Sequence, residues 1–128
     1  MNEQAEQLRK RVKAFAIRVL RFVSTLSQNP ATLVVSRQLA RSGSGESANY
    51  HAACRARSRA EFIAKLGTVV EEADESEHWL DVLHASALAS GEEIEWLRSE
   101  SRELRAIFKA SLDTARANYE RSRRKPKS

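Results

Sequence analysis

The scarcity of glycine and proline limits most strongly what this chain can fold into. Only four glycines and two prolines occur among its 128 residues, so the chain has few places at which to reverse direction. A β-sandwich or β-barrel needs a turn about every 8–12 residues, and this sequence does not supply them. The length is that of one domain, and a hydrophobic content of 41% is enough for one core. We therefore expect a single all-α domain built from long helices.

Hydrophobic periodicity predicts four amphipathic helices, at about residues 4–27, 30–57, 59–89 and 92–120. The first shows the pattern most clearly, because apolar residues recur at steps of four and three: Leu8, Val12, Phe15, Val19, Phe22 and Leu26. Asn29-Pro30 and Ser58 with Glu61 have the spacing of helix N-termini. The connections are too short to cross the bundle, so residues 1–120 are expected to form an up-down-up-down antiparallel four-helix bundle. Residues 121–128 are expected to form a basic, disordered tail.

The second helix has the weakest pattern, because its middle reads Ser42-Gly43-Ser44-Gly45. Each glycine costs about 1 kcal/mol relative to alanine inside a helix. Either the helix breaks into two here, or the small residues let a neighbouring helix approach closely; we favour one long helix, with or without a kink. Asn49 falls on the apolar stripe, where a buried amide would set the helix register or the number of subunits.

Charge is distributed unevenly along the chain, which has a net charge of +5. Residues 58–90 carry two basic and seven acidic side chains, a net of −5, and the segments on both sides are basic. If the second and third helices form an antiparallel hairpin with its turn near residues 57–58, Arg41 lies opposite Asp74 and Glu75. We expect these groups to pair within a subunit or between subunits, together with a structural role for Asn49 and Tyr50.

The candidate functional surface is basic. Sixteen of the 22 basic residues are arginine, whose planar fork suits phosphate, although a GC-rich genome would also raise the arginine content. The start of the first helix and the end of the fourth lie at the same end of an up-down bundle. The candidate nucleic-acid-binding residues are Arg9, Lys10, Arg11, Lys13, Arg18, Arg21, Arg121, Arg123, Arg124, Lys125 and Lys127. Aromatic residues are not interleaved among them, so binding is expected to be independent of base sequence.

No complete catalytic or metal-binding constellation is present in the sequence. Glu75 and His78 have the Glu-x-x-His spacing of a di-iron bundle site, but that site needs a second such motif and further glutamates. Cys54 has no histidine and acid at the spacing of a nucleophilic site. We therefore expect a protein that is not an enzyme and binds no metal or cofactor. A lone cysteine and the lack of an apolar run of about 18 residues favour a cytoplasmic protein without membrane contact.

A family resemblance rests on residues 36–83, which read SRQLARSGSGESANYHAACRARSRAEFIAKLGTVVEEADESEHWLDVL. The matching elements are Gln38-Leu39, Arg41-Ser42-Gly43, Ala48-Asn49-Tyr50, Glu61-Phe62, Lys65-Leu66 and Trp79-Leu80. In these elements the chain resembles the bacterial four-helix-bundle proteins encoded in intervening sequences of large-subunit ribosomal RNA genes. The likeness covers essentially the whole chain. The sequence departs from the family pattern at His78 and at Glu46, where an aliphatic residue is expected.

The resemblance implies a homopentameric ring of up-down bundles without established catalytic residues. It also implies a relation to the accessory variability proteins of diversity-generating retroelements, which bind nucleic acid and a reverse transcriptase through a basic surface. Apolar residues outside the main stripes, such as Ile17, Ile63, Val70 and Ile107, also favour an oligomer. We thus expect an oligomeric scaffold or adaptor that binds RNA or DNA. The alternative is a protein-interaction module with no nucleic-acid role.

Overall fold

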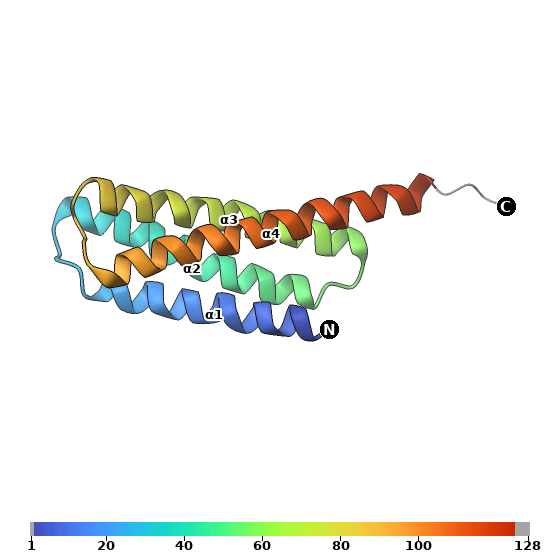
Figure 1. Ribbon diagram of the computed structural model, residues 1–128, viewed down its shortest axis with the longest axis horizontal. Helices are drawn as coiled ribbons and strands as arrows, with labels where there is room; N and C mark the ends of the chain where they lie inside the picture. The colour runs from blue at the N-terminus through green and yellow to red at the C-terminus, as the bar shows by residue number, and fades with distance from the viewer. Residues whose placement is uncertain (1, 125–128) are drawn as a thin grey trace.

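The computed structural model describes residues 2–124, which form an all-α, antiparallel four-helix bundle (Figure 1). The helices are α1 (Glu3–Ser24), α2 (Pro30–Cys54), α3 (Arg59–Ala85) and α4 (Glu92–Arg124). The α1–α2 and α3–α4 connections lie at one end of the bundle, and the α2–α3 connection and the N-terminus lie at the other (Figure 1). Sequential helices pack closely against each other, whereas α1 and α4 contact one another much less. The bundle is therefore more open along its α1–α4 side.

Side-chain caps begin three of the helices. The Asn2 side chain accepts a hydrogen bond from the backbone N–H of Ala5 (2.8 Å), and Asn29 accepts one from Thr32 (3.0 Å). At the start of α3, Ser58 accepts from the backbone N–H of Glu61 at 3.1 Å. Each cap satisfies a backbone donor that the helix itself leaves unpaired. The helix starts expected at residues 30 and 59 are confirmed.

The apolar stripes of the four helices meet in one core. Its fully buried large side chains are Val12, Phe15, Val19, Leu39, Leu66, Leu80, Leu83, Ile94, Leu97, Leu104 and Phe108, together with the carboxylic side chain of Glu46. The core therefore uses the stripe positions expected from the sequence. Burial of this kind contributes about 25 cal/mol for each Å² of apolar surface removed from water, and it is the main term favouring the fold.

The middle of α2 remains helical through Gly43 and Gly45, as expected for one long helix. A Cβ atom on Gly43 would lie only 3.1 Å from Cγ1 of Val19 on α1, and one on Gly45 would collide with the Glu72 carboxylate on α3. Gly43 therefore allows α1 to approach α2 closely, and Gly45 leaves room for the Glu72 carboxylate. The close-approach interpretation is the one that the structure supports.

Three helices end earlier than the sequence pattern indicates. The last helical residues are Ser24 in α1, Cys54 in α2 and Ala85 in α3, where ends near residues 27, 57 and 89 were expected. Side-chain hydroxyls next to two of these ends donate to the last turn: Thr25 to the carbonyl of Phe22 and Ser86 to that of Val82, both at 2.7 Å. The same two carbonyls also accept the backbone N–H groups of Thr25 and Ser86, so each hydroxyl adds a second hydrogen bond at the helix end.

The fourth helix ends later than expected, because α4 continues to Arg124. The expectation of a tail starting at residue 121 is therefore wrong for residues 121–124, and the rest of that segment lies outside the described residues. The sequence contains no glycine or proline between Gly91 and Pro126. Arg124 also lies 3.6 Å from the Glu120 carboxylate one turn earlier, a spacing that stabilises helices.

Replacing Ala87 with glycine is expected to stabilise the fold by about 0.5–1 kcal/mol, because Ala87 has a left-handed backbone with φ of 58°. It follows the end of α3 in a Schellman motif: the N–H of Ala87 donates to His84 O and that of Leu88 to Leu83 O, both at 3.1 Å. Urea denaturation measures the change. In the matched control, Ala85→Gly in the last turn of α3, the free energy of unfolding should fall by about the same amount. A fall in both variants would contradict the prediction.

Candidate nucleic-acid interface

Two of the basic residues predicted on α1 bridge it to α4. The Arg11 guanidinium donates two hydrogen bonds to the Glu100 carboxylate, at 2.7 and 2.8 Å. Arg18 donates two to Glu93, at 2.6 and 3.0 Å, and lies 3.5 Å from the centre of the Trp96 ring. These hydrogen bonds hold the pKa of Glu93 below its ordinary value. Both arginines thus tie together the two neighbouring helices of the bundle that pack least closely.

The remaining basic residues of α1 differ in their surroundings. Arg9 pairs with Glu6 one turn earlier on the same helix, at 2.5 Å. Within residues 2–124, no carboxylate lies in ion-pairing distance of Lys10, Lys13 or Arg21. The set predicted on α1 therefore divides into arginines held by carboxylates and three exposed cations that are not.

The α2–α3 connection carries an arginine cluster that the sequence analysis did not single out. Arg55, Arg57 and Arg59 follow one another at every second residue, and all three are exposed. Arg59 lines a small pocket together with Ala115 and Asn118 of α4, so the connection lies next to the last turns of that helix. The alternation of arginine with small residues in the stretch RARSR was a signal that could have identified it.

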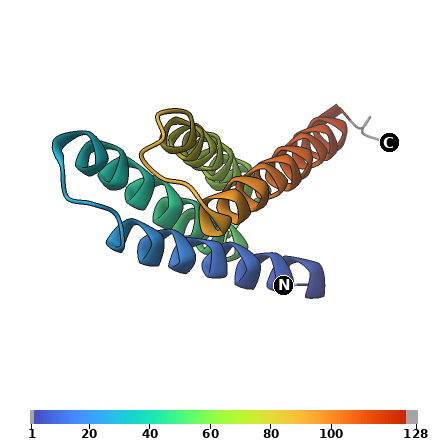
Figure 2. The ribbon, with the colours of Figure 1, turned by 60° about the vertical axis from the view of Figure 1, so that its left-hand side comes forward.

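The last turns of α4 extend beyond the other helices at the same end of the bundle (Figures 1 and 2). Leu112 is the last buried residue of α4. Arg121 bonds to the Asn118 side chain, and the Arg123 guanidinium lies 5.7 Å from the centre of the Tyr119 ring. The predicted residues Arg121, Arg123 and Arg124 are thus displayed on a helix. Lys125 and Lys127 lie outside the described residues.

Together these residues form a basic surface, here called the arginine end: Arg55, Arg57, Arg59, Arg121, Arg123 and Arg124. In the part of the chain that the structure describes, Arg124 is the one member with a carboxylate partner. Most of its positive charge is therefore not neutralised within the subunit. A surface of this kind can bind phosphate groups.

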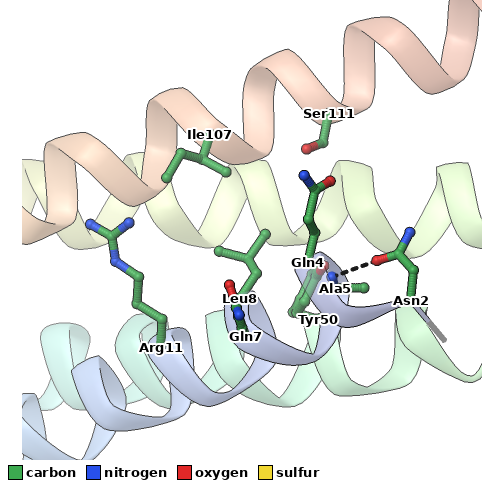
Figure 3. Close-up of a pocket in the computed structure, with 9 residues that line it drawn as sticks. All are labelled: Asn2, Gln4, Ala5, Gln7, Leu8, Arg11, Tyr50, Ile107 and Ser111. Atoms are coloured by element: carbon green, nitrogen blue, oxygen red, sulfur yellow. Dashed lines mark hydrogen bonds between the residues drawn. The ribbon is translucent and has the colours of Figure 1, made fainter.

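A groove between α1 and α4 opens beside the arginine end, with a volume of about 440 Å³. Figure 3 shows the Gln4 amide pointing toward Ser111 of α4, and Leu8 facing Ile107. The other lining residues are Asn2, Ala5, Gln7, Arg11 and Tyr50. The groove thus combines amide and hydroxyl groups with an apolar floor. Such a lining can hydrogen-bond polar groups of a ligand held at the arginine end.

Arg41 lies where the hairpin symmetry places it, across from the acidic segment of α3. Its guanidinium pairs with the Glu75 carboxylate and lies 3.7 Å from that of Glu72. Glu75 also accepts a 3.4 Å hydrogen bond from the Trp79 indole. Asp74, the other expected partner, is exposed and forms no ion pair within residues 2–124. The pair links α2 to α3 within one subunit.

The expectation that Asn49 occupies a buried position of the apolar stripe is wrong within the subunit. Asn49 is half-buried, and its amide donates to the carbonyl of Gly45 in its own helix at 2.8 Å. The apolar stripe of α2 shifts by one residue to Tyr50, whose ring centre lies 5.1 Å from that of Phe108 on α4. Burial raises the pKa of the Tyr50 hydroxyl. The larger ring fills the core position because it removes more apolar surface from water.

Two turns before Asn49, α2 contributes Ser42 to a layer of buried hydroxyl groups shared by three helices. Ser42 of α2, Ser76 of α3 and Ser101 of α4 are all fully buried. Ser76 donates a 2.9 Å hydrogen bond to the Ser42 hydroxyl. The Ser101 hydroxyl has no hydrogen-bond partner in the described chain. The layer therefore places hydroxyl groups at the centre of the bundle.

Glu46 lies in the same region of the core and has no exposed surface. Neither carboxyl oxygen forms a hydrogen bond to a described residue. Burial raises the pKa of Glu46 to about 8; the nearby Ser76 hydroxyl opposes this rise, and the charges of Glu72 and Glu100 add to it. The departure from the family pattern therefore reflects a carboxylic acid inside the core rather than a different register.

The candidate metal and nucleophile residues are dispersed. His78 is exposed and packs edge-on against the Trp79 ring, at 4.8 Å between centres. Cys54 is half-buried, and burial raises the pKa of its thiol. Within residues 2–124, no three His, Cys, Asp or Glu side chains lie close enough together to hold a metal ion. In the same residues, no helix is long and apolar enough to cross a bilayer.

The geometry defines a small four-helix-bundle protein with an arginine-rich surface at one end. The chain belongs to the family of 23S rRNA-intervening sequence proteins, which it matches over residues 5–110. It is also similar to a crystal structure of a protein of unknown function from the S23 ribosomal protein family of Bacteroides thetaiotaomicron VPI-5482. The TM-score is 0.77 with 29% sequence identity, covering 85% of this chain and 97% of that one. A search of curated proteins gives no match.

Proposed function

We propose that this protein is a non-enzymatic scaffold or adaptor that binds the phosphate backbone of RNA or DNA through its arginine end. The observation that carries the proposal is the grouping of six arginines from two separate segments of the chain. Within the described residues, one of the six, Arg124, pairs with a carboxylate. Arginine matches phosphate geometry through its planar fork, and each neutralised phosphate releases counterions. The helical conformation of the backbone at Arg121 and Arg123 also favours phosphate binding, because a helix holds the two side chains in place before binding.

The binding is proposed to be independent of base sequence. Base stacking needs exposed aromatic rings, and the one aromatic residue in the last turns of α4, Tyr119, is half-buried beneath Arg123. Phosphate contacts position a protein on nucleic acid without reading its sequence.

The scaffold is further proposed to be a homo-oligomer, with a pentamer favoured. Ile63 and Val70 on α3 and Ile107 on α4 are half-buried apolar residues outside the main stripes, and they would be covered by another subunit. A ring would repeat the arginine end around one rim and multiply its affinity for phosphate. Light scattering tests the assembly: the mass of five chains supports it, and the mass of a single chain contradicts it. By family analogy, a reverse transcriptase is the protein partner to test.

A salt titration tests nucleic-acid binding. Fluorescent single-stranded RNA and DNA are titrated with the intact chain and with the variant Arg57→Gln/Arg59→Gln/Arg121→Gln/Arg123→Gln. Each phosphate contact contributes about 0.7–0.9 to the slope of log affinity against log salt. The variant is therefore expected to lower the slope by up to about 3 and the affinity about 100-fold at low salt.

The matched control removes the same number of charges from the α1–α2 face, in the variant Lys10→Gln/Lys13→Gln/Arg21→Gln/Arg37→Gln. Its salt slope should stay close to that of the intact chain. An equal loss in both variants would contradict a site at the arginine end. No binding by the intact chain at low salt would favour the alternative, a protein-interaction module without a nucleic-acid role.

A further inference from the structure

The outer face formed by α1 and α2 exposes apolar side chains. Ile17 is 41% exposed, Leu20 43% and Val34 59%. Val34 lies two heptads before Ala48 on α2, so it is on the stripe of α2 that faces outward beside α1. In the part of the chain described, the one other large hydrophobic side chain with comparable exposure is Trp96, and the Arg18 guanidinium covers its ring. Apolar exposure is thus concentrated on the α1–α2 face.

A groove of about 440 Å³ runs along this face. Its floor consists of the small residues Ala16, Ser44, Ser47 and Ala48, and Ile17 and Leu20 line it together with Arg9, Lys13 and His51. The distance between two packed helices depends on the side chains at their contact, so a floor of small residues allows close approach of a further helix. The dimensions and lining of this groove fit an amphipathic helix.

The charged residues around the groove are mostly basic, and Arg9 is the one of them that pairs with a carboxylate of the described chain, that of Glu6. In the described residues, no carboxylate pairs with Lys10, Lys13 or Arg21 of α1, or with Arg37 of α2. By contrast, Arg11 and Arg18, which face α4, are held by its carboxylates. A helix with glutamate or aspartate beside its apolar stripe would supply the missing partners.

A second copy of this chain fits the groove poorly. Pairing two α1–α2 faces across a two-fold axis would bring Lys13, Arg21 and Arg37 of both copies together, and like charges repel. The acidic face of α3 offers no exposed large hydrophobic residue in the described chain. Several of its carboxylates are engaged, Glu75 by Arg41 and Glu77 by Arg105, and the unpaired carboxylates in the described chain include those of Glu71 and Asp74.

We infer that the α1–α2 face is a docking surface for an acidic amphipathic helix of another protein. The apolar stripe of that helix packs on Ile17, Leu20 and the small-residue floor, and its carboxylates pair with the lysines and arginines at the edges. This inference concerns a face different from the arginine end, and it does not depend on nucleic-acid binding.

The test uses a fluorescent synthetic peptide of about three heptads, with leucine at a and d and glutamate at e and g. Fluorescence anisotropy measures its binding to the intact chain and to two variants, Ile17→Asn/Leu20→Asn and Lys13→Glu/Arg21→Glu. Each variant is expected to weaken binding at least about tenfold, because truncated anchor residues typically lose that much or more. A peptide with lysine in place of glutamate is expected not to bind.

The matched control, Arg121→Glu/Arg123→Glu, changes the same charge at the arginine end and should leave peptide affinity within about twofold. An equal loss of peptide affinity in this control, or no binding of the peptide to the intact chain, would overturn the inference. Sedimentation velocity provides a second readout. If Ile17→Asn/Leu20→Asn reduces the mass of an oligomer, the face joins copies of this chain, and the inference is wrong. Circular dichroism verifies that the variants fold, which is expected because both substituted apolar residues are exposed.

Discussion

The substitution Glu46→Leu is expected to stabilise the fold by about 2–4 kcal/mol at pH 8. Glu46 is fully buried in the core, and neither of its carboxyl oxygens has a hydrogen-bond partner in the described chain. A charge or unsatisfied polar group in such a place costs free energy, and replacing it with an apolar side chain of similar volume often stabilises a protein. Leucine also matches the aliphatic residue that the family pattern places at this position.

The effect depends on pH in a defined direction. Burial raises the pKa of Glu46 from its ordinary value of 4.5 to about 8, so the folded state holds a proton that the unfolded state releases. The contribution of Glu46 to the free energy of unfolding is therefore fully present below about pH 4.5. It falls as pH rises toward 8 and reaches its lowest level above that value. Each pH unit inside the window changes it by about 1.4 kcal/mol.

Urea unfolding at several pH values between 4.5 and 9 measures this effect for the intact chain, Glu46→Leu and Glu46→Gln. Both variants should lose the fall in stability with rising pH, so both should be more stable than the intact chain near pH 8. At pH 4.5 only Glu46→Leu should be more stable, because glutamine leaves a polar group buried. The exposed substitution Glu71→Gln serves as a control and should keep the pH dependence of the intact chain. A similar pH dependence in all four proteins would show that Glu46 does not titrate between these limits.

The substitution Phe108→Ala is expected to destabilise the fold by about 3–5 kcal/mol. Phe108 is fully buried on α4, and its ring packs against Tyr50 of α2, which is itself buried. Truncation removes the transfer free energy of the ring and leaves a cavity that the surrounding helices cannot fully close. The contact between the two rings adds about 0.5–1.5 kcal/mol to the loss.

Chemical denaturation at pH 5, where Glu46 is protonated in the folded state, isolates this effect. Phe108→Leu retains most of the apolar volume, so its loss of unfolding free energy should be less than half that of Phe108→Ala. The exposed substitution Ser99→Ala on the same helix should change stability by no more than about 0.5 kcal/mol. A loss below about 1 kcal/mol for Phe108→Ala would mean that the Tyr50–Phe108 contact is not part of the folding core.

Much of the fold follows from local patterns in the sequence. Leu8, Val12 and Phe15 recur at helical spacing, and the same is true of the stripes in α3 and α4, so the number and order of the helices could be predicted. The Arg41–Glu75 pair followed from the symmetry of an antiparallel hairpin about its turn. The predicted helix ends were less accurate, because apolar residues such as Leu26 and Leu88 pack against the core although they lie beyond the ends of α1 and α3.

The candidate site was only partly predictable. Arg121 and Arg123 were identified from the basic run at the end of the chain, but Arg55, Arg57 and Arg59 were not. These three residues precede Arg121 by more than one helix, and the bundle brings the two segments to the same end (Figure 1). Conversely, Arg11 and Arg18 belong to a basic run in the sequence, and the structure pairs them with carboxylates of α4.

The sequence by itself determined the all-α class, the four helices and the faces that they bury, because backbone propensity and apolar spacing act between residues a few positions apart. The tertiary structure decided that Tyr50 rather than Asn49 enters the core, that Glu46 is enclosed there, and which arginines are left without carboxylate partners. These properties depend on the positions of side chains on other helices. Burial and ion pairing are set by that arrangement, which no short stretch of sequence contains.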